Sequence, residues 1–197
     1  AQVQPSVVQI DTPNGLGSGV VLDAQGDIVT NAHVVGTASG LTVTASDGST
    51  FRASLVGSYA GNDLAVVRAD GAGASLKPAT LGDSGQVRLG DIVLAMGSPL
   101  GLTGSVSEGI VSGTDRTQSE ANGVNLSGLI QTTAAVGPGN SGGALVDISG
   151  RVIGIPTLSA SSSPRGGGAS SIGFAIPSNQ VASVTRQLIS SGSVTSP

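Results

Sequence analysis

The chain alternates short apolar runs with turn-forming residues along most of its length. The runs are rich in Val, Ile and Leu, and Gly, Asn-Gly or Asp-Gly separates them. Because such runs favour strands and these dipeptides favour tight turns, the pattern predicts antiparallel hairpins in a sandwich or barrel. The predicted strands are residues 7–10, 19–22, 28–30, 41–44, 50–53, 64–68, 91–95, 109–112, 129–132, 144–147 and 152–155.

One segment near the C-terminus follows a different period. From Val181 onward, apolar residues recur at i, i+3, i+7 and i+8, which places them on one face of a helix. Pro177 and Ser178 are typical of a helix start, and Gly192 is typical of a helix end. We therefore predict an all-β body with a single terminal helix over residues 178–191.

The predicted β body divides into two halves. Residues 81–90 are typical of a connection, so we expect an N-terminal barrel over residues 1–90 and a second barrel with the helix over residues 91–197. The polar segment 112–123 and the Ser/Gly-rich segment 159–171 are predicted to be long loops. Long loops in compact domains are usually functional or mobile, and a disordered surface insertion is the alternative for each.

Composition narrows the chemistry that the chain can perform. Its 197 residues include eight Lys and Arg and carry a formal net charge of −4, which does not suit a nucleic-acid-binding surface. The absence of Cys excludes disulfides, thiolate metal sites and Cys nucleophiles. The single histidine excludes a His-rich metal site, so we predict no metal.

No apolar run approaches the roughly 18 residues that a membrane span needs. No leader opens the chain, so we expect any export signal to lie outside this sequence.

The segment Gly-Pro-Gly-Asn-Ser-Gly-Gly at 137–143 carries the strongest chemical signal. Gly residues around Ser141 permit the backbone angles of a tight turn, and successive N–H groups in such a turn can converge on an oxyanion. An ordinary Gly-Ser loop is the alternative. The segment also fits the G-x-S-x-G pattern of α/β-hydrolases, but that fold needs a His after the Ser, and none follows Ser141.

A serine nucleophile needs a base and an acid that orients the base. His33 is the only candidate base, although a lone His often has a structural role. Asp63 directly precedes an apolar strand, whereas Asp47 and Asp70 lie in Asp-Gly turns. The order His33, Asp63, Ser141 is the chymotrypsin order. A subtilisin order would need an acid before the His, and the β pattern does not suit that fold.

A second glycine-rich segment, Gly-Leu-Gly-Ser-Gly at 15–19, superficially suggests a dinucleotide loop. A dinucleotide loop opens a helix within a βαβ unit, and no helical pattern follows this segment. We therefore predict a hairpin near the site and no cofactor.

Taken together, these segments resemble the HtrA/DegP-like branch of trypsin-fold serine proteases. The resemblance implies a double β-barrel with the active site between the barrels. It also implies an exported protease of protein quality control, located in the bacterial periplasm, in the cell envelope or outside the cell, that acts on unfolded polypeptides. It assigns His33 as base, Asp63 as orienting acid and Ser141 as nucleophile, with Gly139, Asn140 and Ser141 in the oxyanion hole. The matching segments are residues 17–21, 26–35, 62–67, 97–101, 109–112, 130–132, 137–145 and 172–177.

The resemblance also implies a substrate pocket whose base is set by the residue six positions before the nucleophile, which is Ala135. That loop has no acid to pair with a substrate Arg or Lys, so we expect cleavage after small or medium aliphatic residues. Arg165 in the segment 159–171 is a competing influence that would favour acidic or polar residues. The implied pocket residues are Ala135, Val136, Gly137, Ile155, Pro156 and Thr157.

The sequence departs from the family pattern at several points. Thr133 stands where the family commonly has Asp, which leaves the pocket loop less well defined. A PDZ domain is compatible with a longer protein, but none follows the helix here. Family trimers use aromatic contacts near the N-terminus, and the aromatic residues Phe51, Tyr59 and Phe174 lie elsewhere, so a trimer is not expected. Two alternatives stay open: a chaperone or peptide-binding module without catalysis, and a structural β-domain in which the three site residues lie apart.

Overall fold

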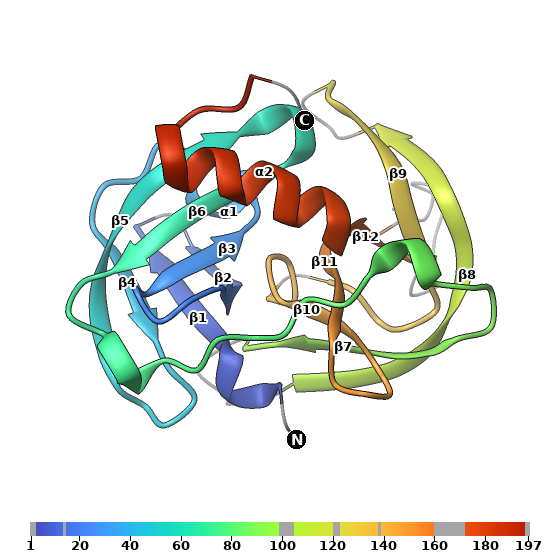
Figure 1. Ribbon diagram of the computed structural model, residues 1–197, viewed down its shortest axis with the longest axis horizontal. Helices are drawn as coiled ribbons and strands as arrows, with labels where there is room; N and C mark the ends of the chain where they lie inside the picture. The colour runs from blue at the N-terminus through green and yellow to red at the C-terminus, as the bar shows by residue number, and fades with distance from the viewer. Residues whose placement is uncertain are drawn as a thin grey trace.

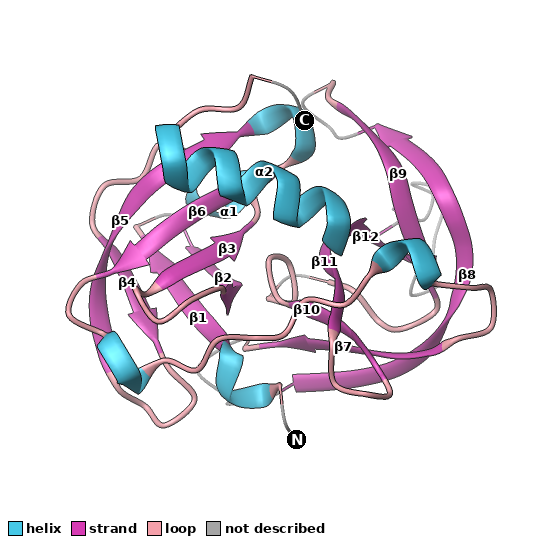
Figure 2. Ribbon diagram, in the orientation of Figure 1, coloured by secondary structure: helices cyan, strands magenta, loops and turns pink. Residues whose placement is uncertain are grey.

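The computed structural model describes residues 3–13, 15–98, 105–119, 123–137, 139–159 and 172–195. Over these residues it consists of two six-stranded antiparallel barrels that lie side by side, with one long helix across them (Figures 1 and 2). The predicted fold class is therefore confirmed. No helix in this described part of the chain is long and apolar enough to cross a membrane.

The first barrel has the strand order β1-β2-β3-β6-β5-β4 and closes where Ile10 of β1 pairs with Val43 of β4. Val, Ile and Leu face its interior, as the alternation of apolar residues predicts. Its strands are β1 (Val7–Thr12), β2 (Gly15–Val21), β3 (Asp27–Thr30), β4 (Leu41–Thr44), β5 (Thr50–Tyr59) and β6 (Leu64–Ala69).

The second barrel repeats this topology, with the order β7-β8-β9-β12-β11-β10, and closes where Ala95 of β7 pairs with Leu145 of β10. Its strands are β7 (Ile92–Gly97), β8 (Ser105–Ser119), β9 (Asn125–Thr132), β10 (Ala144–Asp147), β11 (Val152–Ser159) and β12 (Gly173–Pro177). The helices are α1 (Ala32–Val35), α2 (Ser178–Ser191) and the short 3-10 helices η1 (Gln4–Ser6), η2 (Ala60–Asn62), η3 (Gly73–Ser75) and η4 (Ser84–Gln86).

Helix α2 has the bounds that the sequence predicts. Val181, Val184 and Leu188 on its inner face have no exposed surface. The helix packs against strands of both barrels, β5 and β6 on one side and β11 and β12 on the other (Figure 1). It ends at Gly192, whose φ of 72° is the left-handed conformation that glycine adopts most readily.

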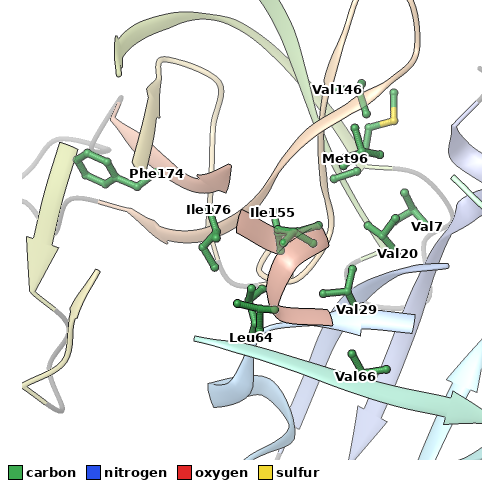
Figure 3. Close-up of a cluster of buried hydrophobic side chains, with 14 of the residues drawn as sticks. Val7, Val20, Val29, Leu64, Val66, Met96, Val146, Ile155, Phe174 and Ile176 are labelled. Carbon is green, nitrogen blue, oxygen red and sulfur yellow. The ribbon is translucent and has the colours of Figure 1, made fainter. Parts of the chain in front are cut away.

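A continuous apolar cluster joins the two barrels beneath α2 (Figure 3). Val29 and Leu64 of the first barrel and Ile155 and Ile176 of the second barrel belong to it, together with Leu188 of the helix. Burial of such side chains contributes roughly 25 cal/mol for each Å² removed from water. The cluster therefore holds the two barrels in one arrangement, and the candidate site lies between them.

The prediction of a loop at 112–123 is wrong where the structure describes that segment. Strand β8 continues to Ser119 and pairs with β9 as far as Asn125, with several register shifts on the way. The polar residues of this segment are typical of a loop. They occur in a strand here because the outer part of the hairpin is mostly exposed and so lacks an alternating apolar face. Of the other predicted loop, 159–171, residues 160–171 lie outside the described residues.

Candidate active site

Asp63 occupies a tight turn between η2 and β6, at the edge of the first barrel. Its φ of 50° is a left-handed conformation, which Asp tolerates better than most residues. Its backbone carbonyl accepts hydrogen bonds from the Ala32 N–H and from the Asn31 side-chain amide, both at 3.1 Å. Only 2% of the Asp63 surface is exposed. Its backbone is therefore held against the segment that leads into α1.

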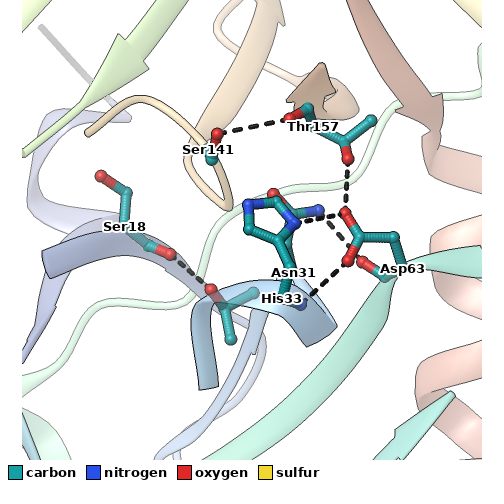
Figure 4. A network of polar contacts seen from close by, with 7 residues as sticks. Ser18, Asn31, His33, Asp63, Ser141 and Thr157 are labelled. Carbon is teal, nitrogen blue, oxygen red and sulfur yellow. Dashed lines mark hydrogen bonds and ion pairs between the residues drawn. The ribbon is translucent and has the colours of Figure 1, made fainter. Parts of the chain in front are cut away.

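His33 lies in α1, directly beside the Asp63 carboxylate (Figure 4). Its Nδ1 is 2.8 Å from Asp63 Oδ2, and its backbone N–H donates to Oδ1 at 3.0 Å. The His33 side chain is 43% exposed, whereas the Asp63 side chain is 2% exposed. The pair is therefore a buried carboxylate that anchors an imidazole facing solvent.

Thr157 of β11 completes the surroundings of this carboxylate from the second barrel. Its hydroxyl donates to Asp63 Oδ2 at 2.5 Å. The carboxylate thus accepts three hydrogen bonds, two from His33 and one from Thr157. Three donors from two barrels restrict the orientation of this carboxylate.

Ser141 enters the site from the loop before β10, so the second barrel supplies it. Figure 4 shows His33 between Ser141 and Asp63. The Ser141 hydroxyl donates to the Thr157 carbonyl at 3.3 Å, and the Ser141 carbonyl accepts from the Ser18 N–H at 3.0 Å. Gly142, which follows, has a φ of 81°, and a Cβ there would clash with the Ser18 carbonyl. The loop can therefore approach the first barrel this closely only with glycine at 142.

The backbone N–H groups of the loop around Ser141 differ in their hydrogen bonding. Gly139 has a φ of 97°, and the Asn140 N–H donates to the Gly137 carbonyl at 3.0 Å. Among the hydrogen bonds of the described residues, none uses the N–H of Gly139 or of Ser141 as donor. Within the described residues these two N–H groups thus have no acceptor, whereas the N–H of Asn140 is engaged inside the loop.

The residues implied as a substrate pocket have different surroundings. Ala135 is exposed and its carbonyl accepts from the Asn140 amide at 3.1 Å, and Val136 packs against Gly173 of β12. Ile155 has no exposed surface and belongs to the cluster between the barrels, so its side chain lines no open pocket. Thr157 directs its hydroxyl to the acid, a role that the sequence reasoning missed because nothing links residues 94 positions apart.

In the described part of the chain, no group of three or more His, Asp or Glu side chains is placed to hold a metal ion. The titratable groups of the site are His33 and Asp63, and both belong to the arrangement above. The polar groups that the site brings together are a hydroxyl, an imidazole and a carboxylate.

The sequence pattern of the Trypsin-like peptidase domain matches residues 17–155. The chain therefore belongs to the trypsin-like peptidase family. Within this family its domain is of the HtrA type, as the similar proteins indicate.

The similar proteins are named proteases from several sources. "Protease Do-like 1, chloroplastic" of Arabidopsis thaliana is 44% identical over 95% of this chain and 42% of its own length. "Periplasmic serine endoprotease DegP" of Salmonella typhimurium is 46% identical over 91% of this chain and 37% of its own length. A solved structure described as "HtrA-type protease AlgW with tripeptide" superimposes with a TM-score of 0.86 at 40% identity, over 98% of this chain and 62% of that one. The chain thus spans less than half the length of these two sequence relatives.

Proposed function

We propose that this chain is a serine endopeptidase domain that cleaves unfolded polypeptides through an acyl-enzyme. The observation that supports it best is the 2.8 Å contact between His33 Nδ1 and the buried Asp63 carboxylate, next to Ser141 from the other barrel. A nucleophile, a base and an orienting acid in this arrangement define serine hydrolase chemistry, whatever the fold.

The proton moves along a single path in this proposal. A carboxylate only accepts hydrogen bonds, so His33 carries its proton on Nδ1 and presents a lone pair at Nε2. Nε2 takes the proton of Ser141 as Oγ attacks the substrate carbonyl, and then returns it to the leaving amine. Water repeats the sequence on the acyl-enzyme and releases the second product.

One local change of position must precede the attack. The Ser141 hydroxyl turns from the Thr157 carbonyl toward His33 Nε2, a rotation about one side-chain bond. Catalytic hydrogen bonds are often long before substrate binds, so this starting geometry is compatible with the role. The negative charge that develops on the substrate oxygen is then bound by the N–H groups of Gly139 and Ser141.

We also propose that the primary pocket accepts small or medium aliphatic side chains. Ala135 and Val136 offer no charge there, and a buried cationic side chain without a partner would cost several kcal/mol. Each methylene buried in such a pocket contributes about 0.8 kcal/mol until the pocket is full. Since DegP relatives are named as periplasmic, we propose an extracytoplasmic location for this chain as well.

Two measurements test the proposed function. A fluorophosphonate probe should label the wild-type protein and the exposed-helix variant Ser190→Ala, but not Ser141→Ala, because only an activated serine reacts. Hydrolysis of fluorescently labelled β-casein should be lost with Ser141→Ala, while the melting temperature changes little. An unlabelled wild-type protein that still binds casein would favour the peptide-binding alternative. Cleavage concentrated after Arg or Lys would contradict the proposed aliphatic pocket but not the proposed catalytic residues.

A further inference from the structure

Ser18 of β2 lies where the first barrel meets the loop that carries Ser141, and it is completely buried. Its flanking residues leave little space around it. A Cβ at Gly17 would clash with the Val34 side chain, and a Cβ at Gly19 would clash with Ile28. Glycine at 17 and at 19 therefore lets this part of β2 lie close to α1 and β3 of its own barrel.

The hydroxyl, the backbone N–H and the carbonyl of Ser18 all form hydrogen bonds with residues near the candidate site. Its hydroxyl donates to the Gly139 carbonyl at 2.5 Å and accepts from the Ser98 N–H at 2.9 Å. Its backbone N–H donates to the Ser141 carbonyl at 3.0 Å, and its carbonyl accepts from the Thr30 hydroxyl at 2.6 Å. A single residue of the first barrel thus binds the loop of the second barrel on both sides of Asn140.

The peptide group between Gly139 and Asn140 is the one that Ser18 controls. Its carbonyl accepts from the Ser18 hydroxyl, and its N–H donates to the Gly137 carbonyl at 3.0 Å. This peptide group is therefore held at both ends. It lies between the two N–H groups that the proposed function assigns to the oxyanion hole, that of Gly139 before it and that of Ser141 after it.

Without the Ser18 hydroxyl, one end of this peptide group would be free to rotate. Gly139 has no side chain to resist a change of its backbone angles, and its φ of 97° is not otherwise fixed by a hydrogen bond of its own N–H within the described residues. A change of the Gly139 torsions that Asn140 does not compensate would tilt the Ser141 N–H relative to the Gly139 N–H. Donors of this kind act only if their directions are set before the charge develops.

We infer that Ser18 is a positioning residue for the oxyanion hole, in which its hydroxyl sets the directions of the Gly139 and Ser141 N–H groups. The inference rests on the proposed function, because an oxyanion forms only if Ser141 attacks a carbonyl. Ser18 does not touch the substrate in this role. Its removal should therefore weaken transition-state binding and leave substrate binding nearly unchanged.

The test compares two buried serines whose hydroxyls each donate to a glycine carbonyl. Ser178, like Ser18, is about 1% exposed or less and donates to a glycine carbonyl, that of Gly82, at 2.6 Å. Ser178→Ala removes one buried hydroxyl donor, and Ser18→Ala should lower the melting temperature at least as much, because it also removes the acceptor of the Ser98 N–H. Only Ser18→Ala should lower kcat on labelled β-casein, by about ten- to a hundredfold, with KM within about threefold. Direct loss of an oxyanion-hole donor costs about 10²–10³-fold, which sets the upper limit.

The outcomes separate this role from the proposed function. Hydrolysis that survives Ser141→Ala would overturn both. Hydrolysis that Ser141→Ala abolishes, but that Ser18→Ala leaves within twofold of wild type, would overturn the role of Ser18 alone, as would a rise in KM with kcat unchanged. If Ser18→Ala does not fold, Ser18→Cys keeps a similar volume with only a weak donor. A folded Ser18→Cys protein with full kcat would likewise overturn the inference.

Discussion

Thr157 presents both of its oxygens to the candidate triad. Its hydroxyl donates to the Asp63 carboxylate, and its carbonyl accepts from the Ser141 hydroxyl. It therefore contacts the acid and the nucleophile at once, from β11. The Thr157 carbonyl favours a resting orientation of Ser141, while the Thr157 hydroxyl favours the orientation of Asp63 that His33 requires.

Replacing Thr157 by Val should slow catalysis in addition to lowering the stability of the fold. A hydrogen bond to a charged group contributes about 1.5–3 kcal/mol, so loss of one of three donors to Asp63 should lower kcat about tenfold or more. The control is Thr185→Val, because Thr185 is equally buried and donates to the Val181 carbonyl at 2.8 Å in α2. Steady-state kinetics on β-casein should show the loss for position 157 only; equal kcat values for the two variants would contradict this role.

The sequence indicates the residue types of the site better than their partners. Ser141 and His33 stand out because one is flanked by glycines and the other is the only histidine. Asp63 is favoured by its place before an apolar strand. The contacts of Thr157 and Ser18 join positions 94 and 121 residues apart, and such contacts depend on how two barrels dock, which no local pattern encodes.

At the scale of elements, Asp83 links the connection between the barrels to the start of α2. Its carboxylate accepts from the Asn179 side-chain amide at 2.7 Å and from the Gly85 N–H at 2.9 Å. The Asn179 hydrogen bond, followed by that of Gly85, lowers the pKa of Asp83 below its ordinary value of 3.8. Because the pKa is lower in the folded state, Asp83 contributes stability above about pH 4, and this contribution is lost as the pH falls through its folded-state pKa.

Asp83→Asn should therefore lower the melting temperature slightly near pH 6 and not near pH 2. The carboxylate is fully exposed, so solvent limits the difference to about 2 °C or less. Thermal melts of wild type and variant at both pH values measure it. In an Asn179→Ala background the same substitution should have a smaller effect, since the main cause of the pKa shift is then absent. A difference that grows toward acid would contradict the assignment.

Elements with one buried face were predictable, and elements without one were not. Helix α2 has the predicted bounds because Val181, Val184 and Leu188 recur on a helical face that packs on both barrels. The outer half of β8 escaped prediction because hydrogen bonds to β9, rather than apolar packing, hold most of it. Hydrophobic patterns indicate which residues are buried. They therefore miss strands that are held mainly by backbone hydrogen bonds to a neighbouring strand.

At the scale of the whole molecule, one apolar cluster connects both barrels and the helix. Leu188 lies within it with no exposed surface, and its side chain contacts the backbone of β5 at Gly57. Truncation to Ala should therefore cost about 2–5 kcal/mol of unfolding free energy. Because the cluster is shared, we expect the barrels of wild type and variant to unfold in a single transition.

Denaturant titrations followed by far-ultraviolet circular dichroism measure the loss of unfolding free energy. Calorimetry shows whether thermal unfolding has one transition or two. The control is Ile148→Ala in the turn after β10, where the side chain is 82% exposed and truncation should cost less than about 0.5 kcal/mol. Two separate transitions in the wild-type protein would mean that each barrel is stable alone, contrary to the shared cluster.

The division of the candidate triad between the barrels has a consequence for biosynthesis. His33 and Asp63 belong to the half that the ribosome makes first, and Ser141 to the half that it makes second. A chain still being translated therefore has an imidazole and a carboxylate but no nucleophile placed beside them. Under the proposed function, hydrolysis therefore starts only after the second barrel has closed and docked on the first, so a chain that is still being translated is inactive.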